Sequence, residues 1–143
     1  MSEFTGYNYE DLEVGMAHET VHTITEDDIQ RFAEVSGDFN PLHMSDEFAA
    51  KTIFGKRIAH GALTASYISG ILGNNLPGPG SIFVGLSMRF KRPVHIGDVV
   101  TVRAEVAEKV DRGNRVTLKV ECMVDGKRVI TGDAQVVAPS REA

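Results

Sequence analysis

Two side chains that can exchange protons stand five positions apart in the run Ser36–His43, which reads SGDFNPLH. On a continuous helix the carboxylate of Asp38 and the imidazole of His43 would point about 140° apart, so they would not meet. Gly37 can adopt a left-handed helix cap, and Pro41 donates no backbone hydrogen bond, so we expect no regular helix between them. The chain is therefore expected to fold back and to bring Asp38 and His43 together.

This spacing also has an ordinary structural explanation. Aspartates often form turns at helix ends, and a histidine can simply pack at the surface. However, the apolar residues Phe39 and Leu42 alternate with the polar residues of this segment, whereas loops are normally polar. Polar groups in partly apolar surroundings are typical of sites where pKa values are shifted for acid and base catalysis, which favours the functional interpretation.

The composition limits what else the protein can be. Its 143 residues fit one domain, with a core expected over about residues 10–138 and frayed ends at 1–8 and 139–143. The 15 basic and 20 acidic residues give a net charge of -5, the wrong sign for a protein that binds nucleic acid through its phosphates. We therefore expect no nucleic-acid partner.

No segment predicts secretion or membrane insertion. The N-terminus has no basic patch followed by an apolar run, and no apolar stretch approaches the length needed to span a membrane. The single cysteine, Cys122, cannot form an intramolecular disulfide and is expected in the core. We expect a cytoplasmic protein that does not act at a membrane.

Helices are predicted in the first half of the chain, after a short strand at residues 16–24. Thr25 is the expected N-cap of a helix that runs to Ser36, and Ser45 is the expected N-cap of a brief helix that ends near Gly55. The segment Gly61–Gly73 leaves no continuous polar face, which predicts a buried helix. Its small residues would let a sheet approach it closely.

The second half of the chain predicts an antiparallel meander. Apolar residues alternate with polar ones over residues 82–91, 100–107 and 116–124, and a last strand is expected over about 127–138. Gly113-Asn114 and Asp125-Gly126 are hairpin turn pairs. A sheet that is apolar along one whole face would curl around the buried helix, which is the α+β arrangement of the hot-dog fold. Its exposed edge predicts a homodimer, with a dimer of dimers as the alternative.

Several segments together resemble the MaoC-like family of (R)-specific enoyl-CoA hydratases over about residues 10–138. The run Ser36–His43, followed by Phe48-Ala49-Ala50, is similar to the hydratase motif of that family. The resemblance extends to His60-Gly61 with Ala65–Gly70, to Pro77–Ile82 and to Arg92–Asp98, in the same order. It implies a hydro-lyase that adds water reversibly to a trans-2-enoyl-CoA thioester, giving an (R)-3-hydroxyacyl-CoA, without metal or organic cofactor.

The residues of the motif can carry out that chemistry. Water needs a base as it attacks the β-carbon, and the α-carbon then needs a proton. Asp38 and His43, sharing one water, are the expected catalytic pair, because an ionised carboxylate and either state of an imidazole are accessible near neutral pH. Which of the two activates water stays open, and the pair can titrate as one unit.

Four further residues are expected near this pair. The helix that begins at Gly61 has unsatisfied N–H groups, and the resemblance makes the Gly61 N–H the donor to the thioester oxygen, although close packing would also explain this glycine. His60 is expected to orient the loop rather than to react. Asn40 and Ser69 are candidate supporting residues, and ordinary turn or helix hydrogen bonding explains each of them equally well.

The sequence also contains two small basic clusters and leaves three alternative functions open. Arg89, Lys91 and Arg92 form one cluster and Lys56-Arg57 the other, and solvated surface charge explains them better than contact with coenzyme A phosphates. The alternative functions are dehydration of a 3-hydroxyacyl group on an acyl carrier protein, thioester hydrolysis, and acyl-CoA binding without catalysis.

Overall fold

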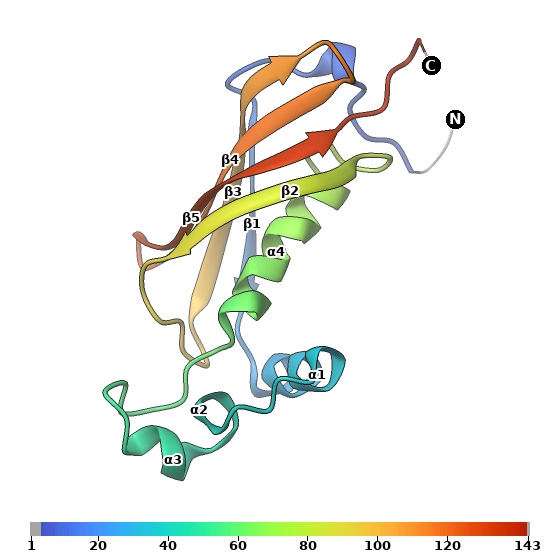
Figure 1. Cartoon of the computed structure of the whole chain (residues 1–143). Coiled ribbons are helices and arrows are strands. Elements are labelled where there is room, and N and C mark those ends of the chain that lie inside the picture. The colour runs from blue at the N-terminus through green and yellow to red at the C-terminus, as the bar shows by residue number, and fades with distance from the viewer. Residues whose placement is uncertain (1–3, 143) are drawn as a thin grey trace.

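In the computed structural model, which describes residues 4–142, a five-stranded antiparallel sheet curves around helix α4, Gly61–Asn74 (Figure 1). The strands lie side by side in the order β1-β3-β4-β5-β2. Their bounds are β1 Ala17–Thr23, β2 Ile82–Phe90, β3 Val99–Val110, β4 Arg115–Val124 and β5 Lys127–Val137. The predicted α+β arrangement, an antiparallel sheet around a central helix, is confirmed.

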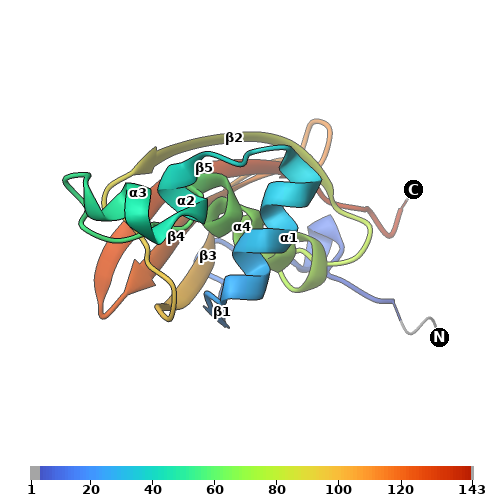
Figure 2. The same cartoon turned by 90° about the horizontal axis from the view of Figure 1, so that it is seen from below.

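Three helices lie together beyond the N-terminal end of α4, as the view along that end shows (Figure 2). They are α1 (Glu26–Ser36), α2 (Pro41–Met44) and α3 (Asp46–Ala50), and a 3-10 turn, η1 (Tyr9–Asp11), precedes β1. None of the described helices is long and apolar enough to cross a membrane.

The predicted start and end of α1 are confirmed. The Asp28 N–H donates to Thr25 Oγ1 at 3.1 Å, and the Thr25 N–H donates to Asp28 Oδ2 at 2.9 Å, so each end of this capping box satisfies the other. Gly37 ends the helix with φ of 79°, a left-handed conformation that costs glycine little. The chain therefore leaves α1 in a new direction immediately before Asp38.

The expectation that residues 38–43 contain no helix is wrong at Pro41. Asn40 caps α2 through its side-chain oxygen, which accepts the Leu42 N–H at 3.0 Å, and Pro41 occupies the first helical turn. A proline suits that position because the N–H it lacks would have no partner there. His43 is thus carried on a helical turn rather than on an extended loop.

Helix α4 is buried on most sides, although one stripe remains open. Tyr67 stacks on His22 of β1 with ring centroids 4.1 Å apart, and the apolar face of the helix packs into the sheet. The small residues Ala62, Ser66, Ser69 and Gly73 stay exposed. Their spacing places them along one side of the helix, the side that the sheet of this chain does not cover. The prediction of a helix buried all round is therefore wrong for that side.

The predicted meander is wrong for β2, which pairs with β5 instead of β3. Residues 91–98 connect the two strands from one side of the sheet to the other. As an edge strand, β2 leaves most of its apolar residues exposed; they are Ile82, Phe83, Val84, Leu86 and Phe90. A register shift between Phe83 and Gly85 also interrupts the predicted alternation, so these residues do not form one continuous face. Met88 packs against the core.

The core is formed by alternate residues of β3 and β4, as their pattern predicts. Its members in these two strands are Val100, Val102, Ala104, Val106, Val116, Leu118, Val120 and Cys122. The prediction that Cys122 is a core residue is confirmed, and burial raises the pKa of its thiol to about 12. Such a thiol is unreactive near neutral pH.

The described parts of both chain ends are hydrogen-bonded. Tyr7 N–H donates to the carbonyl of Pro77 at 2.7 Å, and the Arg141 N–H donates to Glu10 Oε1 at 3.0 Å. Residues 1–3 and 143, which belong to the ends predicted to fray, lie outside the described residues.

The close approach of β2 to β5 makes Gly132 a sensitive position. A Cβ there would overlap the Ser87 carbonyl and touch Met88, so Gly132→Ala should lower the free energy of unfolding by about 1–3 kcal/mol. Gly70→Ala is the matched control, because its Cβ meets no atom within 4 Å and alanine favours helix by about 0.5–1 kcal/mol. Denaturant unfolding measures both, and equal stability of the two variants would contradict this account.

Candidate active site

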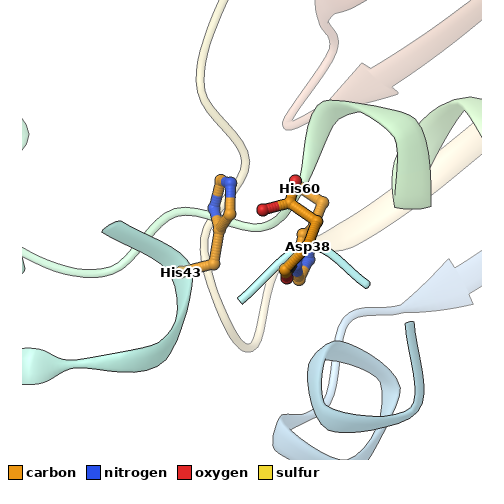
Figure 3. A group of neighbouring side chains, drawn as sticks. All are labelled: Asp38, His43 and His60. Atoms are coloured by element: carbon orange, nitrogen blue, oxygen red, sulfur yellow. Dashed lines mark hydrogen bonds between the residues drawn. The ribbon is translucent and has the colours of Figure 1, made fainter. Parts of the chain in front are cut away.

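Asp38, His43 and His60 converge where the α1–α3 segment meets the start of α4. One ligand-type atom from each lies within 4.8 Å of the others. Figure 3 shows the Asp38 carboxylate directed toward the imidazole of His43, with His60 beside them. The expectation that the chain brings Asp38 and His43 together therefore agrees with the geometry.

The tautomer of the His43 imidazole follows from its hydrogen-bond partner. Its Nδ1 lies 2.7 Å from the carbonyl oxygen of Ile58, and because a carbonyl only accepts, Nδ1 carries the hydrogen. The Nε2 atom of a neutral His43 is then the free basic nitrogen. The ring is buried, so it is held in one orientation beside the pocket described below.

His60 connects the loop that carries Asp38 to the central helix. It is the N-cap residue of α4, it is fully buried, and its Nε2–H donates to the main-chain carbonyl of Asp38 at 3.0 Å. Its ring centroid lies 4.2 Å from that of His43. His60 thus holds the backbone of Asp38 at the helix start, in line with an orienting part.

Asn40 organises the loop from within. The Asp38 Oδ1 accepts the Asn40 N–H at 3.1 Å, and Asn40 Oδ1 in turn accepts the Leu42 N–H at 3.0 Å. The Asp38 side chain is itself exposed. These two short turns fix the separation of Asp38 from His43 and leave the second carboxylate oxygen of Asp38 available.

The expectation that Arg57 is solvated surface charge is wrong, because this side chain ties the three short helices together. Its guanidinium is ion-paired with Glu26 of α1 at 2.5 Å and with Asp46 of α3 at 2.8 Å. It also donates to the main-chain carbonyl of His43 at 3.3 Å, and its hydrogen bond lowers the pKa of Glu26. Since the side chain is nearly buried, Arg57 is occupied structurally and is not a free surface charge.

The amide of Gly61 is available at the first position of α4. Its N–H donates to no acceptor among residues 4–142, as expected of the first turn of a helix. A Cβ at this position would lie 2.7 Å from Cε1 of Phe90. Both explanations of this glycine therefore have a physical basis, since the position combines an open N–H with close packing.

A pocket of about 340 Å³ opens beside His43 and Gly61. Its walls are mostly apolar, and Lys91 and Arg92 also line it; the apolar members are Phe54, Ile58, Ala59, Phe90, Pro93, Val94 and Ile130. Such a cavity, with a few convergent polar groups, suits an acyl thioester. Ser69 lies eight residues further along α4, is exposed and does not line this pocket.

Thr64 is a polar residue of the pocket that the sequence interpretation did not identify. Its hydroxyl is buried and has no hydrogen-bond partner within the described part of the chain. Thr64 and Gly61 are three positions apart on α4, so they share one side of the helix. That spacing, together with the expected part of Gly61, was the signal that could have pointed to it.

The donor set of Asp38, His43 and His60 is one that a transition metal can use. Each histidine also fixes its other ring nitrogen on a main-chain carbonyl, as metal-binding histidines often do. The same three groups can hold a water and move its protons without a metal, because they place a carboxylate and a basic imidazole nitrogen side by side. The absence of a metal from the reaction stays a prediction.

Comparison with known proteins agrees with the sequence resemblance. The chain matches the family described as MaoC like domain over residues 11–135. It is 46% identical over 134 residues to a 3-hydroxybutyryl-CoA dehydratase of Methylorubrum extorquens, covering 94% of this chain and 85% of that protein. It is also 46% identical over 133 residues to an (R)-specific enoyl-CoA hydratase of Rhodospirillum rubrum, covering 93% and 92%.

Structural comparison gives the same result. The R-hydratase PhaJ1 of Pseudomonas aeruginosa superposes with a TM-score of 0.90 at 43% identity, covering 95% of this chain and 88% of that one. The fold is therefore the hot-dog fold, as predicted. The chain belongs to the MaoC-like family.

A substitution of Thr64 can show whether its buried hydroxyl serves stability or contact with substrate. Thr64→Val keeps the shape and removes a buried, unsatisfied polar group, so the free energy of unfolding should rise by about 1 kcal/mol. If the hydroxyl contacts substrate in the pocket, turnover should fall in the same variant. Denaturant unfolding and steady-state kinetics measure the two effects; a loss of stability would show that the hydroxyl has a structural partner.

Proposed function

We propose that this protein is an (R)-specific enoyl-CoA hydratase that interconverts trans-2-enoyl-CoA and (R)-3-hydroxyacyl-CoA. The observation that carries the proposal is the open Gly61 N–H and the buried His43 in one apolar pocket, with Asp38 adjoining them. An acid–base pair beside a hydrogen-bond donor at a helix start is what hydration of a conjugated thioester requires. The reactions named for its relatives in M. extorquens and R. rubrum support it.

In the proposed mechanism, Asp38 and His43 hold one water between them. As the water oxygen bonds to the β-carbon, one of the pair takes a water proton and the electrons of the double bond move toward the thioester oxygen. The Gly61 N–H and the positive end of α4 stabilise that oxygen. A proton then reaches the α-carbon, so the elements of water are added across the double bond.

The remaining site residues are proposed to position this pair. His60 holds the backbone of Asp38, and Asn40 sets the turn that leads to His43. Ser69, exposed on the open side of α4, is not part of the pocket described within this chain, so any contact with substrate would require a neighbouring subunit.

Loss of either catalytic side chain should abolish hydration. Asp38→Asn and His43→Gln keep the size of each side chain but remove its ability to exchange protons, so kcat should fall by at least about 100-fold. The decay of the conjugated enoyl absorbance of crotonyl-CoA measures the rate. Denaturant unfolding is the control for folding, and full activity in either variant would contradict the assignment.

The same assay separates the alternatives. Release of free coenzyme A would indicate thioester hydrolysis, faster turnover of acyl carrier protein thioesters would indicate the carrier-protein dehydratase, and binding without turnover would indicate a non-catalytic acyl-CoA module.

Activity that persists after dialysis against EDTA is expected for a reaction that needs no metal, and its loss would point to a metal on Asp38, His43 and His60.

We further propose that the protein is a cytoplasmic homodimer. The open apolar edge strand β2 supports dimerisation, because unpaired strand edges are usually covered in native proteins. A dimer of dimers is the alternative. The single, buried Cys122 suits a reducing compartment, which supports the location.

A charge on β2 should separate the two copies. Val84→Lys places a cation on the edge strand and should shift the mass measured by light scattering toward that of one 15.6 kDa chain. Val35→Lys, on the exposed side of α1, is the matched control and should leave the mass unchanged. An unaltered dimer in the Val84 variant would place the interface elsewhere.

A further inference from the structure

The cations of this acidic protein are distributed in two ways. Many basic side chains within residues 4–142 have a carboxylate or carbonyl partner, such as Arg31 with Asp27 and Arg103 with Glu19. Five basic side chains that have no hydrogen bond or ion pair within residues 4–142 lie close together; they are Arg89, Lys91, Arg92, Lys119 and Lys127. Unpaired like charges repel, so their grouping needs a different explanation from random surface charge.

Four of these five cations line one broad groove of about 1000 Å³. Lys119 alternates along β4 with the core residues Leu118 and Val120, so the groove lies on the face of the sheet opposite α4. Arg128 also lines it, and its guanidinium is ion-paired at 2.9 Å with Glu121, the acid of the groove. Glu121 is thus neutralised, and the other four cations of the groove form no ion pair within residues 4–142, although Asp133 lies beside Lys119 in the neighbouring hollow.

The groove and the active-site pocket adjoin each other, because they share two lining residues. Lys91 and Arg92 line both cavities, and the Lys91 N–H donates to the carbonyl of Val129 at 2.8 Å, which holds this segment between them. A ligand whose reacting end lies beside His43 and Gly61, and which leaves the pocket past Lys91 and Arg92, would reach the groove that Lys119 and Lys127 also line.

We propose that this groove, on the outer face of β4 and β5, binds the phosphate groups of the nucleotide end of coenzyme A. The inference rests on the proposed function for the identity of the ligand. Coenzyme A joins its thioester to a nucleotide with three phosphates through a long flexible arm, which matches an apolar pocket that adjoins a cation-lined groove. Lysine and arginine side chains are the usual partners of phosphate in proteins.

A nucleotide suits the groove better than a carrier protein does. The cations line a hollow rather than a projecting surface, and a hollow accepts a small ligand more readily than the convex face of a globular partner. The names of the relatives in M. extorquens and R. rubrum also specify coenzyme A.

Charge reversal in the groove tests the proposal. The double variant K119E/K127E leaves Lys91 and Arg92 in place, and it should raise KM for crotonyl-CoA about tenfold at low salt with kcat nearly unchanged. The KM for the crotonyl thioester of N-acetylcysteamine, which lacks the nucleotide, should not change. R112E/R115E is the matched control, because it makes the same change in net charge at the opposite end of β4.

A binding measurement keeps the test independent of catalysis. Adenosine 3′,5′-bisphosphate, titrated by calorimetry, should bind the unmodified protein and the R112E/R115E control alike and should bind K119E/K127E about tenfold more weakly. This outcome is expected even if hydratase activity is absent. Equal binding to all three proteins would overturn the proposal, as would a K119E/K127E defect confined to acyl carrier protein substrates, which would identify a protein-docking surface instead.

Discussion

The hydrogen bond from His60 Nε2 to the main-chain carbonyl of Asp38 connects the two parts of the molecule on which the site depends. One part is the α1–α3 segment, which carries Asp38 and His43, and the other is α4, whose first turn presents an open N–H. A bond of this kind contributes only about 0.5–1.5 kcal/mol to stability, yet leaving a buried imidazole or carbonyl without a partner would cost more. Breaking this hydrogen bond would therefore cost more free energy than the bond itself contributes to stability. In the same way, the imidazole of His43 on α2 donates from Nδ1 to the main-chain carbonyl of Ile58.

Arg57 stabilises the same segment from its other side. By contacting Glu26, Asp46 and the backbone of His43, it joins α1, α2 and α3, which are too short to be stable helices in isolation. Short helices fixed by polar side chains hold their functional groups within narrow limits, which acid–base catalysis requires. The sheet and α4 supply the rigid support on which this segment places Asp38 and His43.

The surface of the molecule is divided by the sheet. On the inner side, the open stripe of α4 and the edge strand β2 expose small and apolar side chains, which suits contact with another protein copy. On the outer side, unpaired cations follow β4 and β5 and extend to the mouth of the pocket. The end of β2 and the residues after it belong to both regions, since Phe90 lines the pocket while Lys91 and Arg92 line pocket and groove alike. The pocket and the exposed apolar edge of the sheet thus use neighbouring parts of the chain.

The sequence by itself determined whatever depends on local periodicity and turn chemistry. The Thr25 cap, the Gly37 stop, the central helix, the alternation of β3 and β4, and the motif containing Asp38 and His43 could all be recognised in this way, because each rests on residues a few positions apart. Only the tertiary structure decided that β2 pairs with β5, since antiparallel strands of equal apolar pattern do not specify their neighbours. It also decided that Pro41 begins a helix and that Arg57 is an internal ion-pair partner. It likewise showed that the Thr64 hydroxyl is buried without a partner within the described residues. The two cavities also became visible only there, because residues far apart in the chain line them and leave no pattern within any single segment.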